Sequence, residues 1–370
     1  MRPSPFKLER YLEKYEFKAK YVMGASDCET FQLNDILSEK EFFFLGSKTL
    51  GYSQAEGDIL LRREIANLST RVKPEEIVVC APQEGIFLVL NSLLRAGDQV
   101  IVQVPCYQSL CELPKALGSE IITWEPSSKK DKWTWNVDFL REKVNETTKL
   151  IIINSPHNPT GFTFNKKEFG EILSIAEKFG CFIFSDEMYR LLEYDKCDRL
   201  PIGSDVYQNC ISLSGMSKTF GLGGLRIGWL STQNHTILNK IIEFKDYTTI
   251  SNNVLSEYVA MIALQKKEKL LNRNRRIILN NLSILDSFFA SYKDAFTWLK
   301  PKAGSVAFVK TNISRTAKDF CKDLVDQKSV LLVPSTEFNF GNSHFRLGFG
   351  RKNLHEGLNL LEEYLKENNF

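Results

Sequence analysis

Three polar segments that each follow a hydrophobic, strand-like run contain the residues best suited to carry chemistry. They are residues 154–161 (NSPHNPTG), 185–190 (SDEMYR) and 214–229 (SGMSKTFGLGGLRIGW). Their side chains include an amide, a carboxylate, a phenol, an amine and a guanidinium: Asn158, Asp186, Tyr189, Lys218 and Arg226. A lysine that burial and neighbouring cations keep deprotonated can act as a nucleophile or base. Each segment alone has a structural explanation, as a turn, a helix cap or a solvated loop, so the case for a site depends on all three together.

The elements that must position these residues form an α/β pattern between residues 76 and 231. Short β-rich runs alternate there with helical stretches, which predicts βαβ units and a mostly parallel sheet with helices on both faces. The expected strands are 76–80, 99–104, 120–124, 150–155, 181–186, 209–214 and 225–230, and the expected helices are 83–94, 108–117 and 166–179. Ligands of open α/β sheets bind where strands end and helices begin, which is where the three segments lie.

After residue 252 the pattern changes to that of a smaller α+β domain. One long helix is expected over 254–292, shorter helices over 316–327 and 353–367, and strands over 296–299, 305–310, 330–334 and 344–349. A helix over 6–15 is expected to pack on this domain, and SSKKDK at 127–132 reads as a solvated loop. We therefore expect an N-terminal helix and arm (1–45), a large domain (46–252) and a small C-terminal domain (253–370).

Composition excludes several classes of protein. The 370 residues are 43% hydrophobic and 25% charged, which is typical of a folded globular chain. The net charge of +3 is spread along the sequence, which argues against nucleic-acid binding and favours a small-molecule substrate. No apolar run reaches the roughly 20 residues of a membrane helix, and the N-terminus lacks a signal peptide, so a cytoplasmic protein is expected. Eight cysteines and four histidines are dispersed, which predicts neither a metal site nor disulfides.

The three segments, in this order, resemble the signature segments of the fold-type I pyridoxal-phosphate (PLP) enzymes, specifically the class I/II aminotransferases. The resemblance extends from GYSQAEGDILLRREIA (51–66) to FRLGFGR (345–351). It implies an aspartate aminotransferase-like fold, with a three-layer αβα domain that binds pyridoxal 5'-phosphate and a smaller α+β domain. Lys218 would form the Schiff base with the cofactor and move the substrate α-proton, and Asp186 would pair with the pyridinium nitrogen. Asn158 and Tyr189 would bind the phenolic oxygen of the ring, and Asn158 would also line the substrate site.

The same resemblance implies roles for five further residues. Ser217 and Arg226 would hold the cofactor phosphate, the arginine through a forked contact. Tyr107 in VPCYQS would stack on the ring, and Arg346 in FRLGFG would clamp the substrate α-carboxylate. Tyr52 would reach the phosphate of a neighbouring subunit, which implies a homodimer with shared active sites. Tyr107 as a core aromatic and Arg346 as an exposed strand residue are the structural alternatives.

The chain departs from the family at the phosphate site. Many relatives carry a serine three residues before the lysine, whereas this chain has Gly215, with Ser214 as a substitute one step earlier. The loop after the first strand of the large domain reads APQEG (81–85), and Pro82 has no N–H to offer. The amides of Gln83 and Glu84 at the head of the next helix can still bind an anion.

Acidic residues near the N-terminus bear on the substrate. The segment VMGASDCET (22–30) places Ser26, Asp27 and Glu29 where the family has a strand lining the substrate pocket, and Glu9 joins them if the first helix folds over it. Charge complementarity then favours a cationic side chain, such as that of arginine. The alternative is that these acids cap a turn or pair with basic residues outside the site.

The resemblance leaves the reaction open. Our first interpretation is an aminotransferase that moves the α-amino group of an L-amino acid to a 2-oxo acid in a ping-pong cycle. The second is a lyase or cyclase of arginine or a hydroxyarginine, because the N-terminal segment and GMSK resemble the branch that contains capreomycidine synthase. A ligand-sensing regulator is disfavoured because the fold begins within the first tens of residues. GLGGLRIG does not fit GxGxxG and precedes a strand, which excludes a dinucleotide site.

Overall fold

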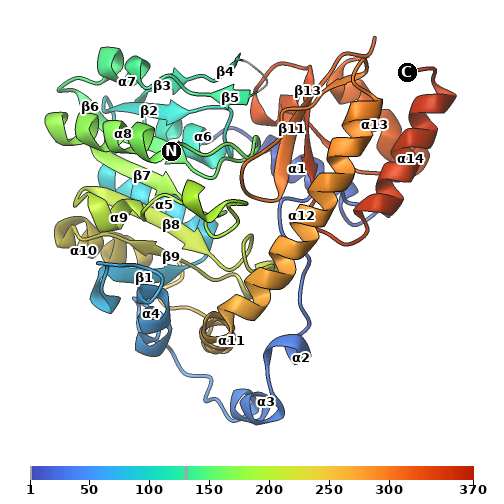
Figure 1. Ribbon diagram of the computed structural model, residues 1–370. Coiled ribbons are helices and arrows are strands. Elements are labelled where there is room, and N and C mark those ends of the chain that lie inside the picture. Colours follow the sequence, from blue (N-terminus) through green and yellow to red (C-terminus); the bar gives the residue numbers. More distant parts are fainter. Residues whose placement is uncertain (1, 130–131) are drawn as a thin grey trace.

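A seven-stranded sheet forms the centre of the larger part of the molecule (Figure 1). The computed structural model describes residues 2–129 and 132–370. In spatial order the strands are β1 (Ile77–Cys80), β9 (Gly228–Ser231), β8 (Cys210–Gly215), β7 (Phe182–Asp186), β6 (Thr148–Asn154), β2 (Gln99–Gln103) and β3 (Glu120–Trp124). Only β9 runs antiparallel to its neighbours β1 and β8, while the other pairs are parallel. The predicted α/β class and mostly parallel sheet are confirmed.

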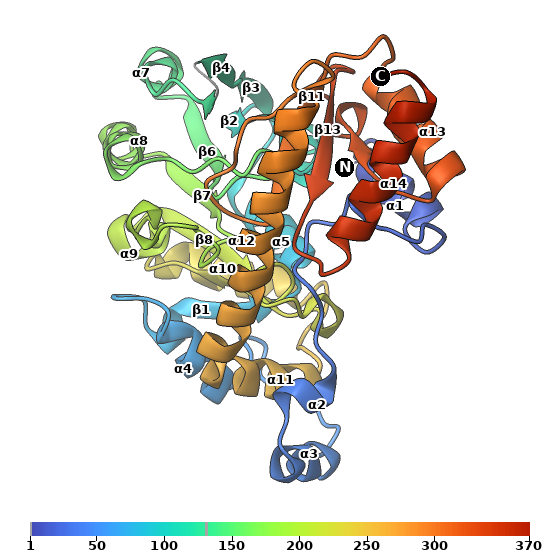
Figure 2. The ribbon, with the colours of Figure 1, turned by 45° about the vertical axis from the view of Figure 1, so that its right-hand side comes forward.

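Helices cover both faces of this sheet, as Figure 2 shows. Alternate residues of β6 explain this arrangement, because Ile152 belongs to one apolar core while Ile151 and Ile153 belong to another. One face packs on α5 (Pro82–Leu93), α6 (Ser109–Ala116) and α10 (His235–Lys245). The other is covered by α7 (Asp138–Lys143), α8 (Lys166–Phe179) and α9 (Gly203–Val206). Strands buried on both faces read as continuous hydrophobic runs, which made them predictable.

The C-terminal part contains a separate antiparallel sheet. Its strand order is β10 (Phe296–Thr297), β11 (Val306–Thr311), β13 (His344–Gly348) and β12 (Val333–Pro334). This sheet lies among α12 (Lys267–Ser291), α13 (Ala317–Lys328) and α14 (Leu354–Glu367), which form the orange and red part of Figure 1. The α+β character expected after residue 252 is present.

The single long helix expected over 254–292 is wrong, because two helices occupy this stretch. A single residue, Lys266, separates helix α11 (Val254–Gln265) from α12, and its backbone is not helical. The Lys266 ammonium binds the carbonyl oxygen of Ile36 at 2.8 Å and the carboxylate of Glu41 at 2.5 Å. The sequence around Lys266 contains no proline or glycine that would mark the break. We attribute the break to these contacts with residues distant in the chain.

The N-terminal segment runs along the whole molecule. Helix α1 (Lys7–Tyr15) packs beside the small sheet, where the Tyr11 hydroxyl donates to the carbonyl oxygen of Leu332 at 2.9 Å. The chain then passes through α2 (Leu33–Ile36) and α3 (Glu39–Gly46) to α4 (Ile59–Ala66) against the large sheet. The expected domain limits at residues 45 and 252 stay predictions.

The segment 127–132 is not the loop that its polar composition suggested. Ser127–Lys129 forms β4, which pairs antiparallel with β5 (Lys132–Thr134), while residues 130 and 131 lie outside the described part. Trp133 of β5 is buried, which holds β5 in place. The polar residues of β4 form a strand because they pair with β5. The strand expected over 225–230 starts later, at Gly228, because Arg226 adopts a left-handed conformation with φ of 55°. No helix in the described residues is long and apolar enough to cross a membrane.

Candidate active site

The carboxyl ends of the parallel strands bring the three polar segments together. Asn154 at the end of β6 lies opposite Asp186 at the end of β7, and Asp186 lies opposite Leu213 of β8. The loops that follow these strands contain Asn158, Tyr189 and Lys218. Because parallel strands place their carboxyl ends at one edge, residues separated by up to 60 positions become neighbours.

The Lys218 amine faces the N-terminal segment. Its Nζ donates a hydrogen bond to the Ser26 hydroxyl at 2.9 Å. Burial lowers the pKa of the Lys218 ammonium; the charge of Asp27 opposes this shift, and that of Arg346 reinforces it. A lowered pKa favours the neutral amine, which is the nucleophilic and basic form.

Asp186 is a carboxyl group with little local compensation. It is 6% exposed, and its Oδ1 accepts a hydrogen bond from the Met188 amide at 3.1 Å. Burial raises its pKa to about 7, the Met188 amide works against this shift, and the charge of Glu187 adds to it. A buried carboxyl of this kind can hold a protonated ring nitrogen, whose charge would stabilise the ionised form.

Arg346 of β13 and Asn158 of the loop after β6 form a buried pair. The backbone N–H of Asn158 donates to Oδ1 of Asn154 at 2.6 Å, and the side-chain Oδ1 of Asn158 accepts from the Arg346 guanidinium at 3.2 Å. A second guanidinium nitrogen of Arg346 donates to the carbonyl oxygen of Gly24 at 2.8 Å. Arg346 is 1% exposed, so the alternative of an exposed strand arginine does not hold.

Three buried polar atoms at this site have no hydrogen-bond partner in residues 2–129 and 132–370. They are the Tyr189 hydroxyl, the Ser217 hydroxyl and Nε of Arg346. Buried polar atoms are rarely left without a partner, so each indicates a binding position for something else. They belong to the loops after β7 and β8 and to β13.

The head of α5 explains the departures from the family at the phosphate site. A side chain at Gly215 would place its Cβ 2.9 Å from Cα of Gly228 and 3.2 Å from the Pro82 ring. Gly215 is therefore favoured here because the backbone of Ile227 and Gly228 and the Pro82 ring leave little room for a side chain. The amides of Gln83 and Glu84 in the first turn of α5 have no partner within the helix and can bind an anion.

Two other residues expected near the phosphate, Arg226 and Glu84, differ in exposure and in hydrogen-bond partners. Arg226 is exposed and its guanidinium donates to the carbonyl oxygen of Gly223 at 3.0 Å. The Glu84 carboxylate accepts hydrogen bonds from the hydroxyls of Thr248 and Thr249 at 2.5 and 2.7 Å. Sequence reasoning missed these threonines, because nothing in DYTTIS marks them as partners of a helix head.

Ser214 is not brought to the head of α5. Its hydroxyl lines a cavity on the other face of β8 and lies 3.5 Å from the carbonyl oxygen of Glu187. Alternation along the strand accounts for this, because Ser214 shares a face with Ser212 and Gly215 points the opposite way, towards Pro82. We therefore do not retain Ser214 as a substitute phosphate ligand.

Helix α1 covers the aromatic residue of the site. The Tyr107 hydroxyl donates to the Glu9 carboxylate at 2.7 Å, and the rings of Tyr107 and Phe6 lie 5.0 Å apart. Gln108 fixes the start of the helix by accepting from the amide of Lys7 and donating to the carbonyl oxygen of Pro5. Burial and the charge of Glu9 raise the pKa of Tyr107, which stays a neutral phenol.

The acids of the N-terminal segment divide into two groups. The Glu29 carboxylate accepts a hydrogen bond from the backbone amide of Lys352 at 2.9 Å. Glu29 therefore caps a turn, which agrees with the alternative explanation for these acids given in the sequence analysis. Asp27 forms a two-oxygen ion pair with Arg351 at 3.1 Å. The Glu9 carboxylate is bound by a phenol rather than by a cation. Of these acids, Glu9 is the one best placed to receive a cationic group.

The structure also shows the surroundings of His157, expected to be a turn residue, and of Tyr52, expected to face a second subunit. His157 is 1% exposed, shares a hydrogen bond of 2.8 Å with the Thr160 hydroxyl and packs on Trp135. Burial lowers the pKa of His157 to about 3, so it is a neutral structural residue of the turn. Tyr52 is 91% exposed, and its ring lies outside the site of its own chain.

Comparison with known proteins identifies the family. The model of class I and II aminotransferases matches residues 19–359, so the chain belongs to this family. Capreomycidine synthase of Streptomyces vinaceus is 26% identical over 97% of this chain and 93% of that protein. Aspartate aminotransferase of Sulfolobus acidocaldarius is also 26% identical, over 94% and 90%.

Solved structures give the same result. A PLP-dependent aminotransferase from Streptococcus suis superposes with a TM-score of 0.93 at 32% identity, covering 99% of each chain. The PLP-dependent cyclase OrfR superposes with a TM-score of 0.91 at 25% identity, covering 100% of this chain and 98% of that one. The fold is therefore that of the aspartate aminotransferase-like, fold-type I enzymes, and the family implies pyridoxal 5'-phosphate as cofactor.

The residues present fit this cofactor. A lysine with a lowered pKa, a buried carboxyl and the unpartnered hydroxyls of Tyr189 and Ser217 match an aldehyde, a ring nitrogen and polar ring and phosphate oxygens. The free amides at the head of α5 and the guanidinium of Arg226 add donors suited to an anion.

Proposed function

We propose that this protein is an aminotransferase that moves the α-amino group of an L-amino acid to a 2-oxo acid with pyridoxal 5'-phosphate. The observation that carries this proposal is that one edge of the sheet holds both Lys218, whose pKa burial lowers, and the buried Asp186. When bound, the cofactor supplies an electron sink for the bonds at the substrate Cα.

The protein's own residues then have separate tasks. Lys218 would hold the cofactor through its Nζ, and the same amine would take up and return the substrate α-proton. Asp186 would hold the ring nitrogen in its protonated form, and Tyr189 and Asn158 would bind the phenolic oxygen of the ring. Arg346 binds the substrate α-carboxylate with its free Nε–H and the outer face of its guanidinium.

The cofactor is held at its phosphate and at its ring face. Ser217, Arg226 and the amides of Gln83 and Glu84 would bind the phosphate, and Tyr107 would pack on the ring. The exposed Tyr52 would reach the phosphate of a second subunit, so the functional unit would be a homodimer. Sedimentation velocity of the full chain tests the dimer, because a monomer at micromolar concentration would contradict it.

A second candidate function is a lyase or cyclase that acts on arginine or a hydroxyarginine. Glu9 favours it, because a carboxylate beside Tyr107 can receive a guanidinium. Capreomycidine synthase and the cyclase OrfR are among the similar proteins, which places both outcomes within the same fold. The two functions share every group that binds the cofactor and differ in what the substrate loses.

Product analysis separates the two candidates. Purified protein loaded with pyridoxal 5'-phosphate is mixed with single L-amino acids, including arginine and hydroxyarginine, and the products are identified by mass. An aminotransferase releases the 2-oxo acid and leaves pyridoxamine phosphate. A cyclase or lyase returns the original cofactor spectrum and yields a substrate that has lost water or closed a ring. Release of neither product would contradict both proposals.

A further inference from the structure

The Lys218 amine has a hydrogen-bond partner to which the proposed function gives no task. Its Nζ donates to the Ser26 hydroxyl at 2.9 Å, across 192 positions of the chain. Ser26 is 8% exposed, so this contact is removed from bulk water. A lysine side chain is long and flexible, and a fixed partner at its tip therefore decides where the amine points.

Residues of the C-terminal part hold the backbone of Ser26 in place. The carbonyl oxygen of Ser26 accepts a hydrogen bond from the buried Ser305 hydroxyl at 2.8 Å, next to the start of β11. Two residues earlier, the carbonyl oxygen of Gly24 accepts from the Arg346 guanidinium of β13 at 2.8 Å. The Ser26 hydroxyl is therefore a fixed point against which the flexible lysine can be placed.

The N-terminal segment also contacts the lysine loop through its backbone. The Cys28 amide donates to the carbonyl oxygen of Lys218 at 3.4 Å. Burial raises the pKa of the Tyr189 phenol, while the charge of Arg346 and the Ser26 hydroxyl work against this shift. Ser26 thus lies near both the amine and the phenol, two groups to which the proposed function gives tasks at the cofactor.

We propose that Ser26 is a positioning residue that holds the Lys218 amine in place for the transfer of the substrate α-proton. The inference rests on the proposed function, because the amine needs this position only when it is not bound to the cofactor. The proton leaves Cα for Nζ, and the electron pair of the broken C–H bond stays with the substrate and cofactor. As the amine becomes an ammonium, its hydrogen bond to the hydroxyl becomes charge-assisted and stronger.

The hydrogen bond to Ser26 has a definite effect on the proton affinity of Lys218. It stabilises the ammonium more than the neutral amine, so removing the hydroxyl lowers the pKa of Lys218 further than burial already does. The other charged and titratable groups that act on Lys218 stay unchanged when Ser26 is replaced. They are Asp27, Arg346, Glu9, Arg226, Asp186 and Cys28.

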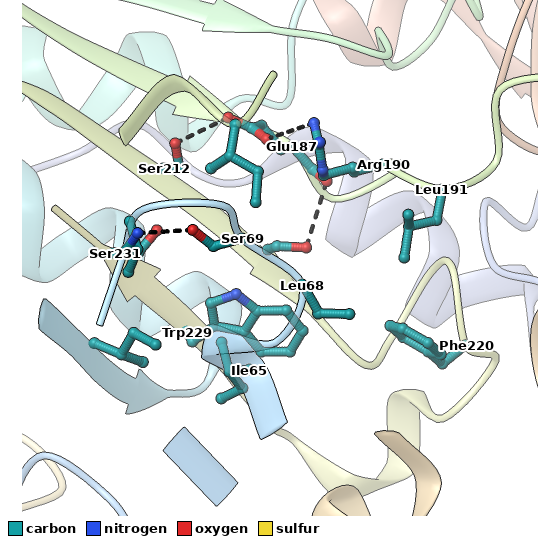
Figure 3. A pocket seen from close by; sticks show the side chains of 14 residues that line it. Ile65, Leu68, Ser69, Glu187, Arg190, Leu191, Ser212, Phe220, Trp229 and Ser231 are labelled. Carbon is teal, nitrogen blue, oxygen red and sulfur yellow. Dashed lines mark hydrogen bonds and ion pairs between the residues drawn. The ribbon is translucent and has the colours of Figure 1, made fainter. Parts of the chain in front are cut away.

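Three variants separate this role from a role in packing. Ser26→Ala removes the hydroxyl, and Ser26→Thr retains it. Ser231→Ala is the matched control, because Ser231 is 6% exposed and shares a hydrogen bond of 2.8 Å with the Ser204 hydroxyl. Ser231 lines the same cavity as Ser214, together with Trp229 (Figure 3).

The first measurement uses the cofactor-free full chain. Acetic anhydride, which is smaller than the cofactor, reacts with neutral amines, and acetylation of Lys218 is followed by mass spectrometry as the pH is varied. We expect the pKa of Lys218 to fall by about 0.5 to 1 unit in Ser26→Ala and to stay within about 0.3 units in Ser26→Thr and Ser231→Ala. An unchanged pKa in Ser26→Ala, or an equal fall in either of the other variants, would overturn the proposal.

The second measurement uses the protein loaded with pyridoxal 5'-phosphate and the amino acid that responds. Ser26→Ala should lower kcat about 5- to 20-fold, leave KM within about twofold and increase the isotope effect of the α-deuterated substrate, because proton transfer alone is slowed. A change confined to KM would overturn the positioning role. If no amino acid responds, the proposed function fails, whereas the titration of the cofactor-free chain still decides the role of Ser26.

Discussion

Replacing Arg346 by lysine is expected to weaken the action on amino acids while leaving the fold and the charge in place. The guanidinium already uses two nitrogens for Asn158 and Gly24, and its buried Nε has no partner among the described residues. A lysine retains the positive charge but loses the planar fork that matches a carboxylate. Two charge-assisted hydrogen bonds are affected, of which the ammonium can restore about one.

The expected loss of kcat/KM corresponds to one charge-assisted hydrogen bond to the substrate carboxylate, together with the disturbed contact between residue 346 and Asn158. Charge-assisted hydrogen bonds contribute about 1.5–3 kcal/mol each, so kcat/KM for the responding amino acid should fall about 15- to 150-fold. Most of the change should appear in KM, because the α-carboxylate is bound in the ground state as well. Arg315→Lys, in a surface pair with Asp323, serves as the control. A fall of less than threefold in Arg346→Lys would refute the assignment of the carboxylate site.

Three further outcomes are expected. In the cofactor-free protein the pKa of Asp186 is raised to about 7, so its ionisation costs stability as the pH rises from about 4 to 7. Asp186→Asn should therefore gain stability relative to wild type over that window, by a few kcal/mol in urea unfolding, and a constant difference would contradict this. Ser217→Ala should weaken cofactor affinity about five- to tenfold while Ser214→Ala leaves it unchanged, measured by fluorescence titration; equal effects would remove the distinction. Glu9→Gln should raise KM selectively for cationic substrates, with Glu29→Gln as the matched control, and equal changes for neutral amino acids would count against a cationic side chain.

Much of the fold could be read from the sequence because its strands are buried on both faces. Runs such as LIIIN and CFIF are long enough to set strand positions, and the loops after them are then fixed at one edge of the sheet. The helix break at Lys266 could not be read in the same way. It arises from contacts with Ile36 and Glu41, more than 200 residues away in the chain.

The site was predictable in its residue types and less so in side-chain direction. The sequence suggested that Gly215 costs the cofactor one phosphate contact, but a side chain there would meet the backbone of Ile227 and Gly228 and the ring of Pro82. Ser214 seemed a substitute, and alternation along β8 turns it to the opposite face. Glu9 and Glu29 carry the same charge, yet tertiary contacts place only Glu9 beside Tyr107. Directions of this kind depend on the packing of distant elements, which the sequence does not display locally.

The most direct test of the central claim is the site of covalent attachment of the cofactor. The protein is loaded with pyridoxal 5'-phosphate, reduced with borohydride, digested and mapped by mass spectrometry. We predict a stoichiometric pyridoxyl adduct on Lys218 that is absent in Lys218→Ala. Lys245 is the informative comparison, because it is a buried lysine at the end of α10 whose pKa is lowered as well. An adduct on Lys245 or another lysine, or no adduct at all, would contradict the account.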